Sequence, residues 1–128
     1  KDNKANTMIL GFSFGAYIAI LSAKNHNFKK LILCSLPSYF KDDIAQLSPM
    51  AHKMLGKKRI KDFAKNAFPT NINTPAVFLV GARDMPLVIQ RAGKSYKKWK
   101  GPKKIVVLKN VEHDINNDLY LEAIKSCI

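Results

Sequence analysis

The chain has 128 residues, 47% of them hydrophobic, and carries a formal net charge of +13. This length and apolar content predict one globular domain over residues 1–128 and exclude a disordered chain. No apolar stretch reaches the roughly 20 residues of a transmembrane helix, so no membrane span is expected.

In the first half of the chain, two apolar runs predict strands, two amphipathic patterns predict helices, and a pair of end signals predicts a third helix. The strands are "NTMIL" (6–10) and "KKLILCSL" (29–36), and a helix over about 14–24 separates them. Ser48 followed by Pro49 is typical of a helix start, and Gly56 of a helix end. A further helix is marked by spaced apolar residues, namely Ile60, Phe63, Ala64 and Ala67.

In the second half, strands and helices alternate. "TPAVFLVGA" (74–82) and "KKIVVLKN" (103–110) predict strands, and residues 86–99 and 117–127 predict helices. All four strand runs are continuously apolar, which is typical of parallel strands covered by helices on both faces. The element order therefore predicts an α/β fold, with a parallel sheet of about four strands flanked by helices and joined by right-handed crossovers.

The segment "GFSFGA" places Ser13 between Gly11 and Gly15, directly after the first strand and before the first helix. This G-x-S-x-G context predicts a sharp strand-to-helix turn that holds a nucleophilic serine in strained backbone geometry. We expect both glycines to allow close approach of strand and helix, and the Phe14 amide to act as an oxyanion donor. The alternative is a glycine-rich turn in which Ser13 only caps the helix.

A nucleophilic serine needs a base, and the chain offers His26, His52 and His113. His26 follows the first helix and His52 lies on a later one. His113 follows the last strand, and loops that follow parallel strands share the carboxyl edge of the sheet with Ser13. His113 is therefore the expected base, and the alternative is a solvated loop histidine.

The base needs an acid to orient it, and two aspartates follow strands at the same edge. Asp84 lies close after the third strand, and Asp43 lies after the second. We favour Asp84, because its loop is nearest to His113 and gives the chain order Ser, Asp, His. Asp114 is adjacent to His113 and is expected to point elsewhere. The alternative for Asp84 is a helix-capping role ahead of Pro86.

Three segments together resemble the α/β-hydrolase superfamily. They are "ILGFSFGAYIAI", "VFLVGARDMPLV" and "VVLKNVEHDI", and the resemblance covers nearly the whole chain. It implies that Ser13 is the nucleophile, Asp84 the acid and His113 the base of a serine hydrolase. The implied reaction is cleavage of a small carboxylic ester or related acyl substrate through an acyl-enzyme, with neither cofactor nor metal.

The chain departs from that family in one large respect. Family members carry several strands before the nucleophile, and a loop among them gives the second oxyanion donor, whereas only a few residues precede the first strand here. We therefore expect the C-terminal half of such a domain, with four neighbouring strands and the first as an open edge. We also expect low activity of the isolated chain and self-association through this edge.

The segment of about residues 37–73 corresponds to the position of a lid in that family. It is short and predicts two small helices, so a large lid for long acyl chains is not expected. Phe12 and Met85 are the expected substrate contacts, and a wider apolar acyl pocket would add Phe14, Tyr39 and Phe40. Aromatic residues at these spacings are also common in hydrophobic cores, which is the alternative interpretation.

The charge and the cysteines bear on partners and compartment. Lysines cluster in residues 57–65 and 94–104, which is typical of solvated helix faces but could also attract nucleic acid or an anionic surface. Few arginines and no aromatic-basic motif argue against a nucleic-acid-binding domain. The other rival is a catalytically inactive hydrolase-like binding or scaffold protein. Cys34 and Cys127 form neither a disulfide framework nor a zinc site, and a reducing, cytoplasmic compartment is expected.

Overall fold

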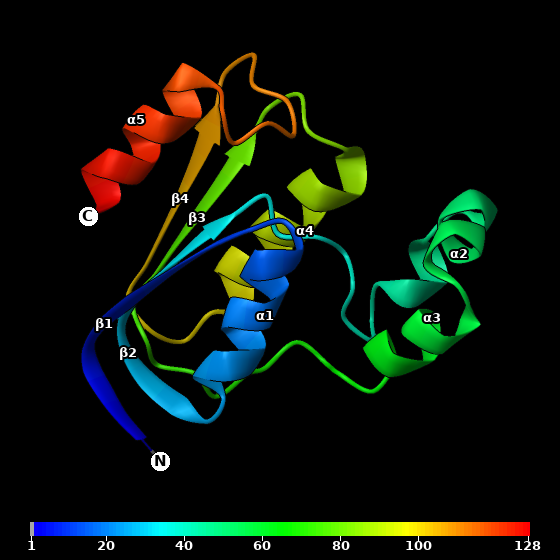
Figure 1. The fold of residues 1–128 in the computed structure, drawn as a ribbon, viewed down its shortest axis with the longest axis horizontal. Coiled ribbons are helices and arrows are strands. Elements are labelled where there is room, and N and C mark those ends of the chain that lie inside the picture. Colours follow the sequence, from blue (N-terminus) through cyan, green and yellow to red (C-terminus); the bar gives the residue numbers. More distant parts are fainter. Residues whose placement is uncertain (1) are drawn as a thin grey trace. The chain divides into compact units, whose positions relative to one another are not determined.

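The computed structural model describes residues 2–128, and its centre is an all-parallel sheet with the strand order β1-β2-β3-β4. Figure 1 shows these strands and the helices around them. The bounds of the strands are β1 (Asp2–Phe12), β2 (His26–Cys34), β3 (Ala76–Gly81) and β4 (Lys103–Leu108). The predicted α/β fold and the contiguous order of the strands are confirmed, with β1 at one edge.

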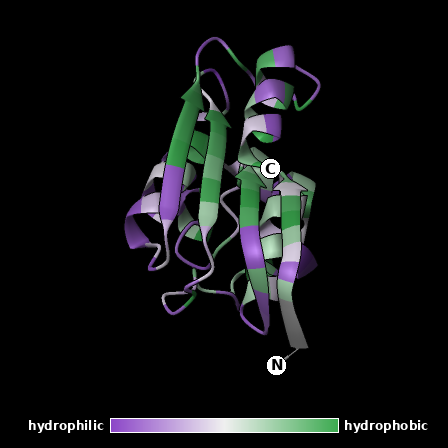
Figure 2. Ribbon diagram, turned by 90° about the vertical axis from the view of Figure 1, so that its left-hand side faces the viewer, coloured by the Kyte–Doolittle hydropathy of each residue, from purple (hydrophilic) through white to green (hydrophobic). Residues whose placement is uncertain are grey.

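Two strands begin earlier than their apolar runs predict. β1 begins at Asp2 and β2 at His26, and these two residues are paired in the parallel register. The pairing shifts between Lys4 and Met8, where β1 carries an irregularity. Backbone pairing thus begins in the polar residues that precede each apolar run, where hydropathy does not indicate a strand. Figure 2 shows the same change along β2 and β4, whose starts are hydrophilic and whose carboxyl ends are hydrophobic.

Helices lie on both faces of the sheet, as the continuously apolar strands predict, but β4 is only partly covered, with Val107 54% exposed. α1 (Phe14–Ala23) and α4 (Pro86–Lys98) lie on one face, and α5 (Asp118–Cys127) lies on the other (Figure 1). The residues of β3 alternate between these faces, because Leu79 packs in a cluster with α5 and Val80 in a cluster with α4. All six residues of β3 are buried, and this strand forms the centre of the core.

The chain separates into two compact units, one of residues 1–37 and 70–128 and the other of residues 38–69. The second unit contains η1 (Ile44–Gln46), α2 (Pro49–Leu55) and α3 (Lys57–Phe63). The Ser48 side chain accepts a hydrogen bond from the Ala51 amide, and Gly56 ends α2 with a φ of 84°, as predicted. α3 ends at Phe63, whereas the apolar spacing predicts that it continues to Ala67.

Aromatic rings pack within this smaller unit. Tyr39 stacks on Phe63 with ring centroids 4.6 Å apart, and Phe40 meets the edge of Phe68 at 5.1 Å. These ring contacts agree with the interpretation of Tyr39 and Phe40 as core residues of this unit. Among the described residues, no helix combines the length and apolar character needed to cross a membrane.

Candidate active site

Ser13 has an unusual backbone conformation at the junction of β1 and α1. Its φ is 55° and its ψ is −122°, a region that residues with side chains rarely adopt. The Ser13 amide donates to the Cys34 carbonyl oxygen at 2.8 Å, which ties the turn to the end of β2. The Ser13 side chain makes no capping hydrogen bond to α1. Ser13 thus occupies the N-cap position of α1, but capping by its side chain does not explain the residue.

The two glycines around Ser13 have different surroundings. A Cβ on Gly11 would lie 2.4 Å from the Gly15 carbonyl oxygen, which confirms that β1 and α1 approach too closely for a side chain there. A Cβ on Gly15 would have nothing within 4 Å. The prediction that Gly15 also needs to lack a side chain is therefore wrong. Its carbonyl group faces Gly11, but a side chain at Gly15 would extend into open space.

His113 lies in the loop after β4 and contacts both Ser13 and Asp84. Its Nε2 is 3.0 Å from Ser13 Oγ, and its Nδ1 is 2.9 Å from Asp84 Oδ1 and 3.1 Å from Oδ2. When the carboxylate is ionised it only accepts hydrogen bonds, so Nδ1 is then the donor to Asp84; in a neutral imidazole, Nε2 then accepts from the serine hydroxyl. The three side chains thus form one hydrogen-bonded series.

The other two histidines lie elsewhere. His26 is the first residue of β2, at the amino edge of the sheet, which is the edge opposite Ser13. His52 lies on α2, and its Nε2 is 3.2 Å from the Ile44 carbonyl oxygen within the smaller unit. The structure therefore brings His113, and neither of these two, to Ser13.

Asp84 is the aspartate that contacts His113. Its side chain has no solvent exposure, and its Oδ1 also accepts from the Met85 amide at 2.7 Å. The Asp43 carboxylate instead accepts from the Phe40 amide within the smaller unit, and Asp114 accepts from the Asn116 amide. The N-cap of α4 is Met85 and not Asp84, so the capping alternative does not describe the main contact of Asp84.

A close approach of two loops aligns Asp84 with His113. A Cβ on Gly81, the last residue of β3, would lie 2.1 Å from the Val111 carbonyl oxygen. The same carbonyl group accepts from the Arg83 amide at 2.9 Å, and the Ala82 amide donates to Leu108. The loops after β3 and β4 are therefore joined backbone to backbone. Sequence reasoning missed Gly81, although a glycine that ends a buried strand is a signal of such an approach.

The nearest thiol is not a competing nucleophile. Cys34 ends β2 and is fully buried. Desolvation by burial, with a smaller contribution from Cys127, raises the pKa of the Cys34 thiol to about 12. Because the thiolate is the reactive form of cysteine, Cys34 is inert at neutral pH.

The expected substrate contacts lie around Ser13 with different exposure. The Phe12 ring packs 4.9 Å from the His113 imidazole, and it is partly buried. Phe14 and Met85 are half exposed, at 50% and 54%, and Phe14 stacks on Tyr17. The substrate-binding role of Phe12 and Met85 remains a prediction.

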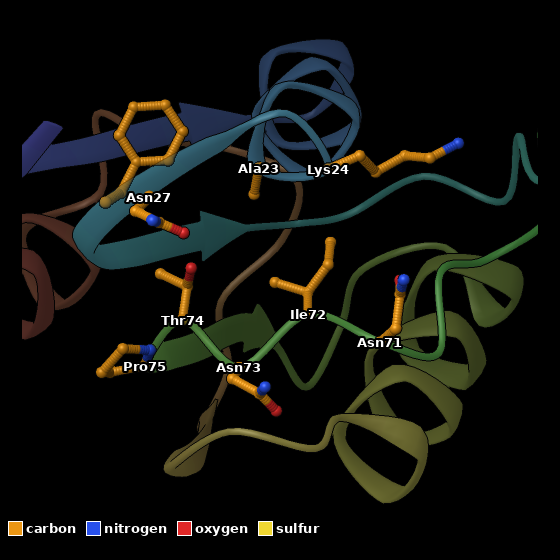
Figure 3. A pocket seen from close by; sticks show the side chains of 9 residues that line it. Ala23, Lys24, Asn27, Asn71, Ile72, Asn73, Thr74 and Pro75 are labelled. Carbon is orange, nitrogen blue, oxygen red and sulfur yellow. The ribbon is translucent and has the colours of Figure 1, made fainter. Parts of the chain in front are cut away.

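A separate cavity of about 300 Å³ lies at the amino edge of the sheet. Figure 3 shows its lining side chains, which come from the end of α1, the start of β2 and the segment before β3. Ser13, His113 and Asp84 are not among them. This cavity is therefore not part of the hydrogen-bonded series at the carboxyl edge.

Solved structures resemble the chain over nearly its whole length. A putative hydrolase from Agrobacterium vitis gives a TM-score of 0.77 at 14% identity, over 94% of this chain and 59% of that one. Mouse alpha/beta hydrolase domain-containing protein 10 gives 0.71 at 14% identity, over 94% and 59%. Human thioesterase 2 gives 0.61 at 18% identity, over 94% and 69%. The chain therefore has part of the α/β-hydrolase fold, as its three motifs predicted.

The match is to part of a larger fold. The chain covers 46% of a serine hydrolase homologue from Coxiella burnetii, 59% of the Agrobacterium protein and 69% of human thioesterase 2. No protein-family model and no curated protein sequence matches the chain.

Proposed function

We propose that the chain carries the catalytic residues of a serine hydrolase that cleaves a small carboxylic ester or a related acyl substrate. The observation that carries this proposal is the hydrogen-bonded series from Ser13 through His113 to Asp84, with Ser13 at a positive φ. The neighbours described as hydrolases and a thioesterase support the general class of reaction.

The proposed reaction begins with transfer of a proton from Ser13 Oγ to His113 Nε2, while Oγ forms a bond to the acyl carbon. Asp84 accepts from Nδ1–H throughout and stabilises the imidazolium that forms. The tetrahedral intermediate collapses as Nε2–H protonates the leaving oxygen or sulfur, and the acyl group stays on Ser13. Water then attacks the acyl-enzyme and gives a proton to His113 Nε2. The second tetrahedral intermediate collapses as Nε2–H returns that proton to Ser13 Oγ, which releases the acid and free Ser13.

The developing oxyanion requires hydrogen-bond donors. Phe14 directly follows Ser13 and is the first residue of α1, so its amide lies at the helix N-terminus. The helix N-terminus also favours negative charge, so the Phe14 amide is the donor that we assign. The resemblance implies a second donor from a segment that precedes β1.

The test is covalent labelling of Ser13 by a fluorophosphonate probe in the full-length protein, together with ester hydrolysis. Ser13→Ala should abolish labelling and lower turnover by several orders of magnitude, with the fold intact by circular dichroism. Ser126→Ala is the matched control, because that exposed hydroxyl bonds only the Ala123 carbonyl group in α5. Near-normal turnover of Ser13→Ala would refute the proposal. An unlabelled wild-type protein would favour the non-catalytic binding alternative.

A further inference from the structure

Tyr120 connects α5 to the ends of two strands near the proposed active site. It is fully buried in the core cluster that α5 forms with the sheet. Its hydroxyl is 2.7 Å from Ser35 Oγ and donates to the Leu79 carbonyl oxygen at 3.0 Å. Because a phenol has one proton, the Ser35 hydroxyl must be the donor in the first of these bonds. The Tyr120 oxygen therefore accepts from the end of β2 and donates to β3.

Ser35 holds this connection in a fixed backbone geometry. Its φ is 48°, and its amide donates to the same Leu79 carbonyl oxygen at 2.8 Å. Ser35 directly follows Cys34, whose carbonyl oxygen accepts from the Ser13 amide. The partner of the Tyr120 hydroxyl is thus one residue from the group that fixes the Ser13 turn.

The ring of Tyr120 connects to His113 through the ring of Phe12. It meets the Phe12 ring nearly at right angles, with centroids 6.0 Å apart, and Phe12 in turn packs 4.9 Å from the His113 imidazole. Phe12 immediately precedes Ser13. An aromatic ring held against an imidazole restricts rotation of the imidazole about its side-chain bonds, and therefore restricts the directions of Nδ1 and Nε2.

The hydroxyl stays protonated at physiological pH. Desolvation by burial is the largest cause that raises the pKa of Tyr120 above its ordinary value, and the charge of nearby Asp84 adds to it. Both hydrogen bonds of the hydroxyl are therefore present throughout the working range of a histidine base.

We propose that Tyr120 is a positioning residue for His113: its hydroxyl fixes the ring against β2 and β3, and the ring holds Phe12 against the imidazole. This inference rests on the proposed function, because it assigns to Tyr120 the orientation of the proposed base. Phe12 then has a second role besides the predicted substrate contact. Tyr120 itself touches neither Ser13 nor the reacting atoms.

The test compares Tyr120→Phe and Ser35→Ala with wild type. Both variants remove the hydroxyl connection, and Tyr120→Phe keeps the ring. The first readout is the ¹⁵N spectrum of the His113 imidazole at a pH where it is neutral. We expect the Nδ1–H form to predominate in wild type, and both variants to show less of it and faster exchange of the Nδ1 proton. The second readout is the rate of Ser13 labelling by a fluorophosphonate, expected to fall about tenfold in both variants.

Ile124→Val is the matched structural control, because Ile124 lies on α5 in the same core cluster and the change removes only packing. The two variants are compared at an equal loss of melting temperature. If Tyr120 had a purely structural role, Ile124→Val would change the imidazole spectrum and the labelling rate as much as Tyr120→Phe does. That result, or an imidazole spectrum of Tyr120→Phe identical to wild type, would overturn the proposal. If Tyr120→Phe does not fold, Ser35→Ala decides in its place.

The two readouts separate this inference from the proposed function. An unlabelled wild-type protein would refute the hydrolase function, yet the imidazole spectra would still show whether Tyr120 orients His113. A labelled wild-type protein with unchanged spectra in both variants would leave the hydrolase function intact and refute the positioning role.

Discussion

At the scale of single residues, the site depends on a few positions where the backbone or the burial is unusual. Ser13 has a positive φ, and Gly11 permits the contact between β1 and α1 that fixes this turn. Asp84 is buried without solvent contact on its side chain, and the His113 ring shields it. A buried carboxylate of this kind is stable only when its oxygens accept hydrogen bonds, which His113 and the Met85 amide provide.

The first prediction concerns the acid. Asp84→Asn should lower ester hydrolysis by about 10³–10⁴-fold, because an amide in this position favours the wrong imidazole tautomer and does not stabilise the imidazolium. Asp43→Asn is the control, since the Asp43 carboxylate accepts from the Phe40 amide within its own unit. It should change turnover less than threefold, by analogy with changes outside an active site. The measurement is steady-state hydrolysis of an ester by the full-length protein, and reversed effects would assign the acid to Asp43.

The second prediction concerns pH and Cys34. The pKa of this thiol is about 12 in the folded chain and near 9 when unfolded, so between these values the unfolded state has lost a proton that the folded state retains. Stability must therefore fall as pH rises above 9, by up to about 1.4 kcal/mol per pH unit from this group. Urea unfolding at pH 8, 9 and 10 measures this change in the free energy of unfolding. The stability difference between wild type and Cys34→Ala should shrink as pH rises, and a constant difference would contradict the assignment.

The sequence predicted these residues unequally, for physical reasons. Ser13, His113 and Asp84 each follow a strand at the carboxyl edge, so their meeting follows from the topology of a parallel sheet. Gly15 was misjudged because a motif does not show which atom of a residue faces its neighbour. Tyr120 and Ser35 carry no local pattern: their contact joins residues 85 positions apart and depends on how α5 packs on the sheet.

At the scale of elements, the order and type of every predicted strand and helix is confirmed, whereas several ends are not. Apolar runs locate the buried part of a strand, and β1 and β2 continue beyond it through backbone pairing alone. The end of α3 at Phe63 was missed because Ala64 and Ala67 extend the apolar spacing into the following turn. The capped ends of α2 were predicted well, since Ser48 and Gly56 act through local backbone chemistry.

The third prediction concerns the contact between the loops after β3 and β4. Gly81→Ala should separate them, because its Cβ would overlap the Val111 carbonyl group. We expect a loss of about 1–3 kcal/mol of stability and a weaker bond between Asp84 and His113. Gly93→Ala is the control, as it lies in α4 with open space at the Cβ and should stabilise by about 0.5–1 kcal/mol. Urea unfolding and the His113 imidazole spectrum measure both effects, and equal behaviour of the two variants would contradict this account.

At the scale of the whole molecule, β1 is an edge of the sheet among the described strands, and it is also the strand that leads to Ser13. Leu10 on β1 and Ile18 on α1 are both more than two-fifths exposed. The chain covers only 46% and 59% of two of the matched hydrolase structures. The Ser13 turn follows this open edge strand and therefore has a neighbouring strand on one side only. Edge strands also present unpaired backbone groups, which recruit other strands.

The last prediction is that the isolated 128-residue chain has little esterase activity and self-associates through β1. The resemblance places the second oxyanion donor before β1, and loss of one such donor typically costs about 10²–10³ in rate. Leu10→Lys should restore monomers, because a lysine on an edge strand opposes pairing between copies. Leu119→Lys, at an exposed position of α5, is the control for added charge and should leave association unchanged. Light scattering and p-nitrophenyl acetate hydrolysis are measured on the same samples. A wild-type monomer with a turnover typical of enzymes, abolished by Ser13→Ala, would show that the chain needs neither a further donor nor a partner for its edge.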